Sequence, residues 1–227
     1  MSRLHDACAR AGRDPGTVEL IAVSKTHPAS AVADLVGCGQ FLFGESRVQE
    51  ARAKIPLCPG RARWHFIGHL QSNKLRQALP CFECFHGIDS LDLAVQADRV
   101  AQELGLHPRV LLQVNVAGES SKFGFRPEAL ERDLETLLGL RRLQIEGLMT
   151  LPPAAPDPER SRPFFRQLRT LRDELAARSG AGLPQLSMGM SGDFQIAVEE
   201  GATLVRVGTA LFGPRPAKGR GMEISDP

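Results

Sequence analysis

Lys25 is the residue of this 227-residue chain whose type and setting most directly suggest chemistry. It follows the apolar run from Leu20 to Val23, which is typical of a parallel strand buried on both faces, and Pro28 then marks the start of a helix. A lysine at the mouth of such a strand loses hydration, which lowers the pKa of its amine and makes it a nucleophile for Schiff bases. The alternative is a lysine that extends to solvent and has no role.

Two glycine-containing segments near the end of the chain could bind an anion. The first, residues 187–193, includes Ser191 and leads into a helix, where backbone N–H groups are unpaired. The second contains Gly208, which lets a ligand approach the backbone, and Thr209, which supplies a hydroxyl. Each segment could also be an ordinary turn.

The elements that must position these residues form a regular alternation of strand-like and helix-like segments. The pattern predicts eight strands, over residues 20–23, 41–46, 63–68, 84–89, 109–116, 143–150, 184–191 and 202–210. It predicts helices between them, among them residues 29–36, 48–54, 91–104, 127–138, 164–175 and 194–200.

This alternation predicts one α/β domain over residues 1–227, a single (β/α)8 TIM-type barrel with a loose tail at 214–227. An open doubly wound sheet is the alternative. In a closed barrel the eighth strand adjoins the first, and phosphate is often bound after strands seven and eight. A lysine amine beside a phosphate site is what pyridoxal 5'-phosphate, an aldehyde with a phosphate, requires.

The chain also resembles a known family, the pyridoxal phosphate homeostasis proteins, which are relatives of the N-terminal barrel of alanine racemase. The resemblance extends from Val18 to Gly213. It rests on ordered motifs: AVSK at 22–25, FGE at 43–45, WHFIG at 64–68, LQSNK at 70–74, QVNV at 113–116, SKFG at 121–124, GLMT at 147–150, SMGMS at 187–191 and VRVGT at 205–209.

The resemblance implies a role for seven residues. Lys25 would carry the cofactor as a Schiff base, and Arg206 would face the pyridine nitrogen. Phosphate contacts would come from Ser191, Gly208 and Thr209, and the pocket would be lined by Met149 and His65. The family usually has Asn at the position of Ser46, so a polar contact there is in question. No catalytic residue and no metal ligand are expected.

Arg206 carries a chemical consequence. A guanidinium donates hydrogen bonds and cannot accept one, so the ring nitrogen that faces it stays unprotonated and the ring withdraws electrons weakly. A phosphate contact or a surface salt bridge is the alternative role for Arg206.

Composition excludes several other functions. A net charge of +2 argues against nucleic acid as a partner, and neither a signal peptide nor a membrane-spanning run is present in the sequence. Five cysteines give no disulfide framework, so a cytoplasmic location is expected. His65 with His69, and Cys81 with Cys84, lack the context of a metal site.

Three functions are compatible with these residues. The favoured one is a carrier in vitamin B6 homeostasis that binds pyridoxal phosphate and buffers it or delivers it, without turnover of its own. Apoenzymes that depend on this cofactor are the candidate recipients. The second is an amino-acid racemase-like enzyme, against which the absence of tyrosine counts. The third is a Schiff-base aldolase that needs no cofactor. The oligomeric state is not indicated.

Overall fold

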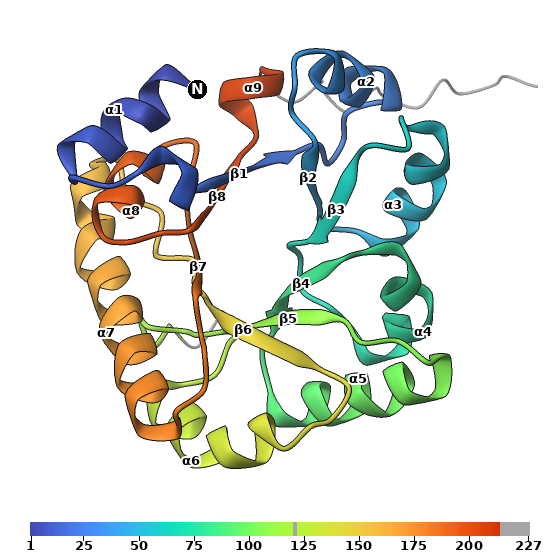
Figure 1. Ribbon diagram of the computed structural model, residues 1–227, viewed down its shortest axis with the longest axis vertical. Helices are drawn as coiled ribbons and strands as arrows, with labels where there is room; N and C mark the ends of the chain where they lie inside the picture. Colours follow the sequence, from blue (N-terminus) through green and yellow to red (C-terminus); the bar gives the residue numbers. More distant parts are fainter. Residues whose placement is uncertain (120–121, 214–227) are drawn as a thin grey trace, which may run out of the picture.

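In a computed structural model, which describes residues 1–119 and 122–213, eight parallel strands form a closed barrel (Figure 1). The strands follow one another around the barrel in chain order, and β8 pairs with β1. Their bounds are β1 Glu19–Val23, β2 Leu42–Glu45, β3 Arg63–Phe66, β4 Cys84–Ile88, β5 Arg109–Gln113, β6 Gln144–Met149, β7 Gln185–Met190 and β8 Leu204–Val207. The predicted TIM-type barrel is therefore confirmed.

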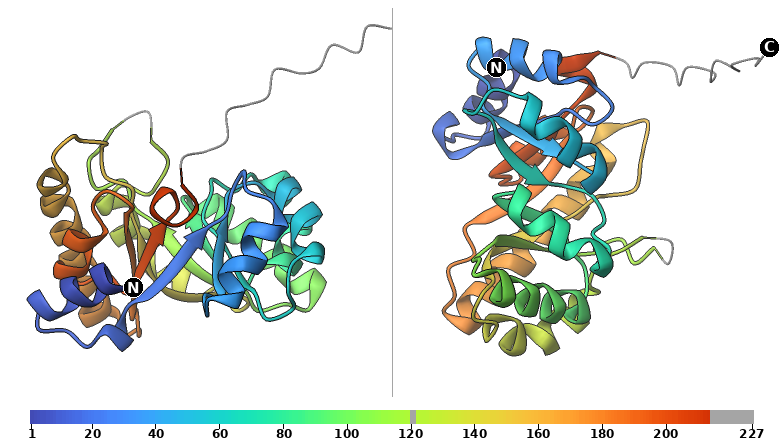
Figure 2. Two further views of the ribbon diagram at one scale, coloured as in Figure 1. Left: turned by 90° about the horizontal axis from the view of Figure 1, so that it is seen from above. Right: turned by 90° about the vertical axis from the view of Figure 1, so that its right-hand side faces the viewer.

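Helices surround the strands on the outside of the barrel (Figure 1). Their bounds are α1 Ser2–Arg10, α2 Ala29–Gly37, α3 Val48–Lys54, α4 Leu75–Ala78, α5 Leu91–Leu104, α6 Pro127–Leu138, α7 Arg162–Ser179, α8 Phe194–Glu199 and α9 Thr209–Phe212. The side view shows α9 at the end of the barrel from which the loops rise (Figure 2). None of the helices in the described part of the chain is long and apolar enough to cross a membrane.

Side chains alternate between the inside of the barrel and the layer of helices, as the strand period of two requires. The outer layer is a continuous apolar core that includes Ala22, Phe43 and Val205. The inside has a smaller apolar cluster, made of Ile21, Leu42, Cys84, Leu111, Met149 and Leu204. In a closed parallel barrel a ligand site belongs at the carboxyl ends of the strands.

The eighth strand is shorter than predicted. The apolar run over 202–210 indicated one strand, but β8 ends at Val207 and Thr209 already begins α9. Gly208 stands between them, with φ −114° and ψ −78°, values that no longer continue a strand. The predicted loose tail at 214–227 lies outside the described residues.

Candidate functional site

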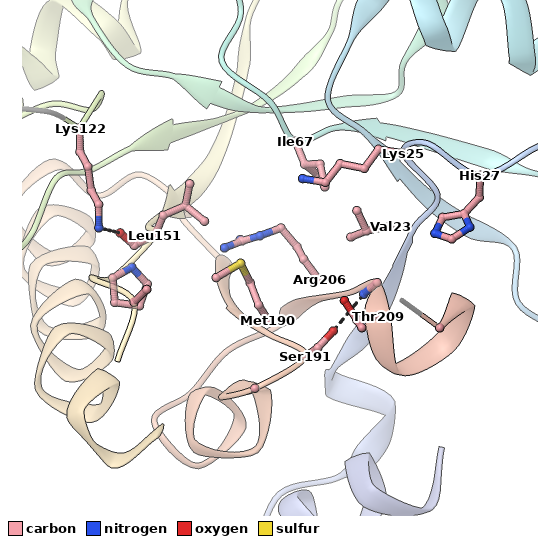
Figure 3. A pocket seen from close by; sticks show the side chains of 15 residues that line it. Val23, Lys25, His27, Ile67, Lys122, Leu151, Met190, Ser191, Arg206 and Thr209 are labelled. Atoms are coloured by element: carbon pink, nitrogen blue, oxygen red, sulfur yellow. Dashed lines mark hydrogen bonds between the residues drawn. The ribbon is translucent and has the colours of Figure 1, made fainter. Parts of the chain in front are cut away.

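Lys25 lies just beyond the carboxyl end of β1. Along this strand Ala22 belongs to the outer core and Val23 lines the inner cavity, so the alternation directs Ser24 outward and Lys25 toward the barrel mouth. Figure 3 shows the Lys25 amine extending into that cavity. The strand alternation that buries β1 on both faces thus directs the Lys25 side chain into the cavity.

A buried ionic network holds the turn around Lys25. The Lys54 ammonium on α3 donates to the backbone oxygen of Ser24 at 2.9 Å and to Oε1 of Glu45 at 2.8 Å. The Ser24 hydroxyl also donates to Oε1 of Glu45, at 2.7 Å. Glu45 is fully buried, and this burial raises the pKa of its carboxyl, which the hydrogen bonds from Lys54 and Ser24 oppose. Ser24 is therefore fixed through both its side chain and its carbonyl.

The residue after Lys25 is fixed as well. Thr26 adopts a left-handed conformation with φ +68°, which is costly for a β-branched residue. Its backbone N–H donates to Oε1 of Glu50 at 2.6 Å, and the same oxygen accepts from Lys54 at 2.9 Å. The Lys54 ammonium thereby connects the hydrogen bonds that fix Ser24 and Thr26, the residues on either side of Lys25. Sequence analysis did not identify this network, although Glu45 lies in one of the quoted motifs.

Arg206 enters the same space from the inner face of β8. Its neighbours Val205 and Val207 face the outer core, so the alternation directs the guanidinium into the barrel. The group is 4% exposed; Nη2 donates to the backbone oxygen of Thr150 at 2.9 Å, and Nη1 donates to the hydroxyl of Ser187. Burial lowers the pKa of Arg206 to about 10, so the guanidinium remains charged at neutral pH.

The predicted anion contacts lie where β7 and β8 end. Gly189 has φ +89°, and a Cβ there would lie 2.5 Å from the Cβ of Ala197, so glycine allows β7 to turn closely over α8. Ser191 follows this turn, and its hydroxyl accepts a hydrogen bond from the backbone N–H of Gly208 at 3.2 Å. Thr209 begins α9 beside them (Figure 3). The loops that follow β7 and β8 thus form one polar rim.

These residues line a single cavity of about 520 Å³. Its lining includes Lys25, Ser191, Arg206, Gly208 and Thr209, five of the seven predicted site residues. Apolar walls come from Val23, Ile67, Leu151 and Met190, and a further cation comes from Lys122. Among the described residues that line it there is no Asp or Glu. The cavity therefore favours an anionic ligand with an apolar body.

Met149 and His65 are not among the residues that line this cavity. Met149 is 1% exposed and belongs to the apolar cluster inside the barrel. His65 is also 1% exposed, and its Nδ1 lies 3.0 Å from Nε2 of His86. The family motifs give the strand on which each residue lies, but not its depth inside the barrel.

The weaker sequence signals lie apart from the cavity. His69 is outside β3, where its ring stacks on Phe123 with centroids 3.7 Å apart and its Nδ1 lies 2.9 Å from a carboxylate oxygen of Asp89. Cys81 and Cys84 are both free thiols.

Comparison with known proteins places the chain in a class. A family model described as the N-terminal domain of alanine racemase matches residues 4–216. An alanine racemase from Clostridium difficile has the same fold, with a TM-score of 0.72, 15% identity, and coverage of 96% of this chain and 58% of the racemase. The fold and site thus define a barrel of the alanine racemase N-terminal class.

Relatives of higher identity give the family. A protein named pyridoxal phosphate homeostasis protein from Aquifex aeolicus is 43% identical to this chain, and the match covers 95% of each. A protein of the same name from Pseudomonas aeruginosa is 44% identical, and the match covers 94% of this chain and 92% of that protein. The chain belongs to the family of pyridoxal phosphate homeostasis proteins, as its motifs predict.

A solved member of this class shows how close the folds are. PipY of Synechococcus elongatus has been solved without PLP, with a TM-score of 0.85 at 42% identity, and with PLP bound, with a TM-score of 0.81 at 41% identity. The matches cover 92% and 93% of this chain, and 99% and 100% of PipY.

Proposed function

We propose that this protein binds pyridoxal 5'-phosphate in the cavity at the mouth of the barrel and acts in the homeostasis of that cofactor. The observation that carries the proposal is the convergence of the Lys25 amine with the hydroxyls of Ser191 and Thr209 at one cavity. The PLP-bound structure of PipY, at 41% identity, supports it.

The donor set fits this cofactor part by part. The backbone N–H groups and hydroxyls where β7 and β8 end would hold the phosphate, as in other barrels. Arg206 would lie against the pyridine nitrogen, and the apolar walls would enclose the ring. The cavity volume of about 520 Å³ lies within the usual range for small-molecule and cofactor sites.

Lys25 would form the covalent link. Its amine would condense with the cofactor's aldehyde, with the loss of one water and without any oxidant or reductant. When bound, the cofactor supplies an electron-withdrawing ring. Arg206 limits that property, because it keeps the ring nitrogen unprotonated. This combination suits a carrier better than a catalyst.

The proposal extends to where the protein acts and with what. We propose a cytoplasmic protein that buffers the cofactor or passes it to apoenzymes that depend on it. The five cysteines, all of them free thiols, support a reducing compartment.

The visible spectrum of the purified protein tests the proposal. A lysine-bound pyridoxal phosphate gives a yellow absorbance, which Lys25→Ala should abolish while the circular dichroism spectrum is retained. Lys122→Ala is the matched control, since Lys122 also lines the cavity but bonds to the Leu151 carbonyl at 3.4 Å and should leave the band intact.

Borohydride reduction followed by peptide mapping assigns the attachment directly. The label should appear on the peptide that contains Lys25. A label on Lys54 or Lys122, or no yellow band after incubation of the native protein with the cofactor, would refute the proposed site.

A further inference from the structure

Four polar side chains form a continuous chain across the inside of the barrel. Arg206 on β8 donates to the hydroxyl of Ser187 on β7. That hydroxyl lies 2.8 Å from Nδ1 of His86 on β4, and Nε2 of His86 lies 3.0 Å from Nδ1 of His65 on β3. The chain thus runs from a cavity-lining guanidinium into the barrel, to a histidine that does not line the cavity.

The direction of each hydrogen bond follows from the donors available. A guanidinium can only donate, so the Ser187 oxygen accepts from Arg206. We assign the Ser187 hydroxyl proton to Nδ1 of His86, because this direction gives that proton an acceptor among the observed partners. A neutral His86 then carries its proton on Nε2 and donates to Nδ1 of His65. His65 in turn carries its proton on Nε2, and this atom is buried with no hydrogen-bond partner among the described residues. Every donor therefore points away from Arg206.

The surroundings favour this neutral arrangement. Ser187 and His86 are fully buried, and His65 is 1% exposed. The charged or titratable groups that act on the two histidines are cationic or neutral: Arg206, Arg109 and Arg63, with the Cys84 thiol beside them. Burial, followed by His65 and then by Arg206 and Arg109, holds the pKa of His86 well below its usual value. Burial, followed by Arg109 and Arg63, lowers the pKa of His65 to about 3.

We propose that Ser187 and His86, supported by His65, are positioning residues for Arg206 that hold its guanidinium at the cavity through neutral acceptors, with no carboxylate in direct contact among the described residues. This inference rests on the proposed function, in which Arg206 faces the ring of the cofactor. A carboxylate in place of Ser187 would bind Arg206 more strongly but would neutralise it. A chain of neutral dipoles fixes the orientation and leaves the positive charge available to the ligand.

A metal site is the competing use of the same residues, because ligand atoms of His65, Cys84 and His86 all lie within 4.8 Å of one another. Both ring nitrogens of His86 are already in hydrogen bonds. Burial also raises the pKa of the Cys84 thiol to about 12, which disfavours the thiolate that a metal requires. The hydrogen-bonded chain is therefore preferred.

Nitrogen-15 NMR of histidine side chains tests the chain without relying on the cofactor. In protein labelled on histidine, long-range proton–nitrogen spectra should show His65 and His86 as neutral Nε2–H tautomers at pH 7, with assignments from His65→Gln and His86→Gln. An Nδ1–H tautomer or a cationic ring at either position would overturn the proposal. So would retention of one equivalent of Zn²⁺ that Cys84→Ser abolishes.

Variants of Ser187 test the consequence for the cofactor. Ser187→Ala removes the acceptor of Arg206 and should weaken binding of pyridoxal phosphate by about tenfold, whereas Ser187→Thr keeps a hydroxyl and should restore most of it. The yellow band of Ser187→Ala should also gain a titration at acid pH, because the ring nitrogen can then be protonated. A purely structural role would lower stability without this new titration.

The outcomes separate this inference from the proposed function. If native protein gives no yellow band, the proposed function fails, whereas the NMR spectra still decide the hydrogen-bonded chain. If the native band is present and Ser187→Ala has the affinity and pH profile of the native protein, the positioning role is refuted while the proposed function stands.

Discussion

At the scale of single residues, the proposed phosphate contacts include two hydroxyls, those of Ser191 and Thr209. Ser191→Ala and Thr209→Val each remove a donor to a charged acceptor, a contact worth roughly 1.5–3 kcal/mol. Each should weaken binding of pyridoxal phosphate by about ten- to a hundredfold. Pyridoxal, which lacks the phosphate, should bind almost as well as before. Titration of both ligands by absorbance checks this, and equal losses for the two would place these hydroxyls away from the phosphate.

Lys54 supports a second prediction at this scale. Lys54→Met leaves the fully buried Glu45 carboxylate without its cation, which should lower the free energy of unfolding by about 3–5 kcal/mol. Because Lys54 also holds the Ser24 carbonyl, covalent attachment at Lys25 should slow. Urea unfolding and the rate of appearance of the yellow band measure the two effects.

A double variant separates the effect of the unpaired Glu45 charge from the loss of the Lys54 contact with the turn. Adding Glu45→Gln to Lys54→Met removes the unpaired charge and should recover much of the lost stability. The slow attachment should persist, since Lys54 no longer holds the turn. Full recovery of both properties would contradict the role of Lys54 as a clamp on the turn.

At the scale of elements, the sequence predicts the strands better than what surrounds their ends. Apolar runs locate all eight strands because burial on both faces leaves a continuous signal. The same signal extends the eighth strand to residue 210, because the side chains of 209–212 suit a strand and a short helix equally well. The change at Gly208 is set by backbone conformation, which apolar patterning does not record.

In the candidate site, the sequence likewise predicts residues in motifs better than contacts between elements. Lys25, Arg206 and the glycine-containing loops belong to recognisable motifs at strand ends. The partners of Lys54 come from the turn after β1, from β2 and from α3, and their association depends on side-chain packing between elements. His65 and Met149 were predicted to line the pocket but do not. The sequence gives the strand on which each lies, whereas its depth in the barrel depends on the stagger of the strands.

Strands β3 and β4 give a prediction on pH at this scale. His65 and His86 stay neutral in the folded protein, whereas in the unfolded chain such histidines protonate near their usual pKa of 6.5. The unfolded state thus binds more protons below that pH, so stability is fully present above it and falls as the pH drops toward the pKa of His65, about 3. Each histidine contributes a slope of up to about 1.4 kcal/mol per pH unit.

Urea unfolding between neutral pH and the acid limit of folding measures this slope. The double variant His65→Gln with His86→Gln should show a flatter dependence than the native protein. His5→Gln, at an exposed position, is the control and should keep the native slope. An unchanged slope in the double variant would show that neither histidine is buried in the neutral form.

At the scale of the whole molecule, a racemase of the same fold invites a test of catalysis. Racemisation needs an acid–base group on each face of the substrate α-carbon, within hydrogen-bond reach. Lys25 could serve on one face. The sequence contains no tyrosine. Among the described residues, the other side chains on the cavity wall that could exchange a proton are Lys122 and His27. The His27 ring stacks on Phe212, with ring centroids 4.8 Å apart.

We therefore expect the loaded protein not to racemise alanine at an enzymatic rate. Arg206 adds to the handicap, because a ring with an unprotonated nitrogen stabilises a carbanion poorly. Deuterium incorporation at the α-carbon of L-alanine in heavy water, with chiral analysis of the product, measures both exchange and inversion. Slow exchange with retention would match a pocket with one base, and Lys25→Ala should abolish it. Conversion to D-alanine at about 1 s⁻¹ or faster, within the usual range of enzymes, would instead establish a racemase.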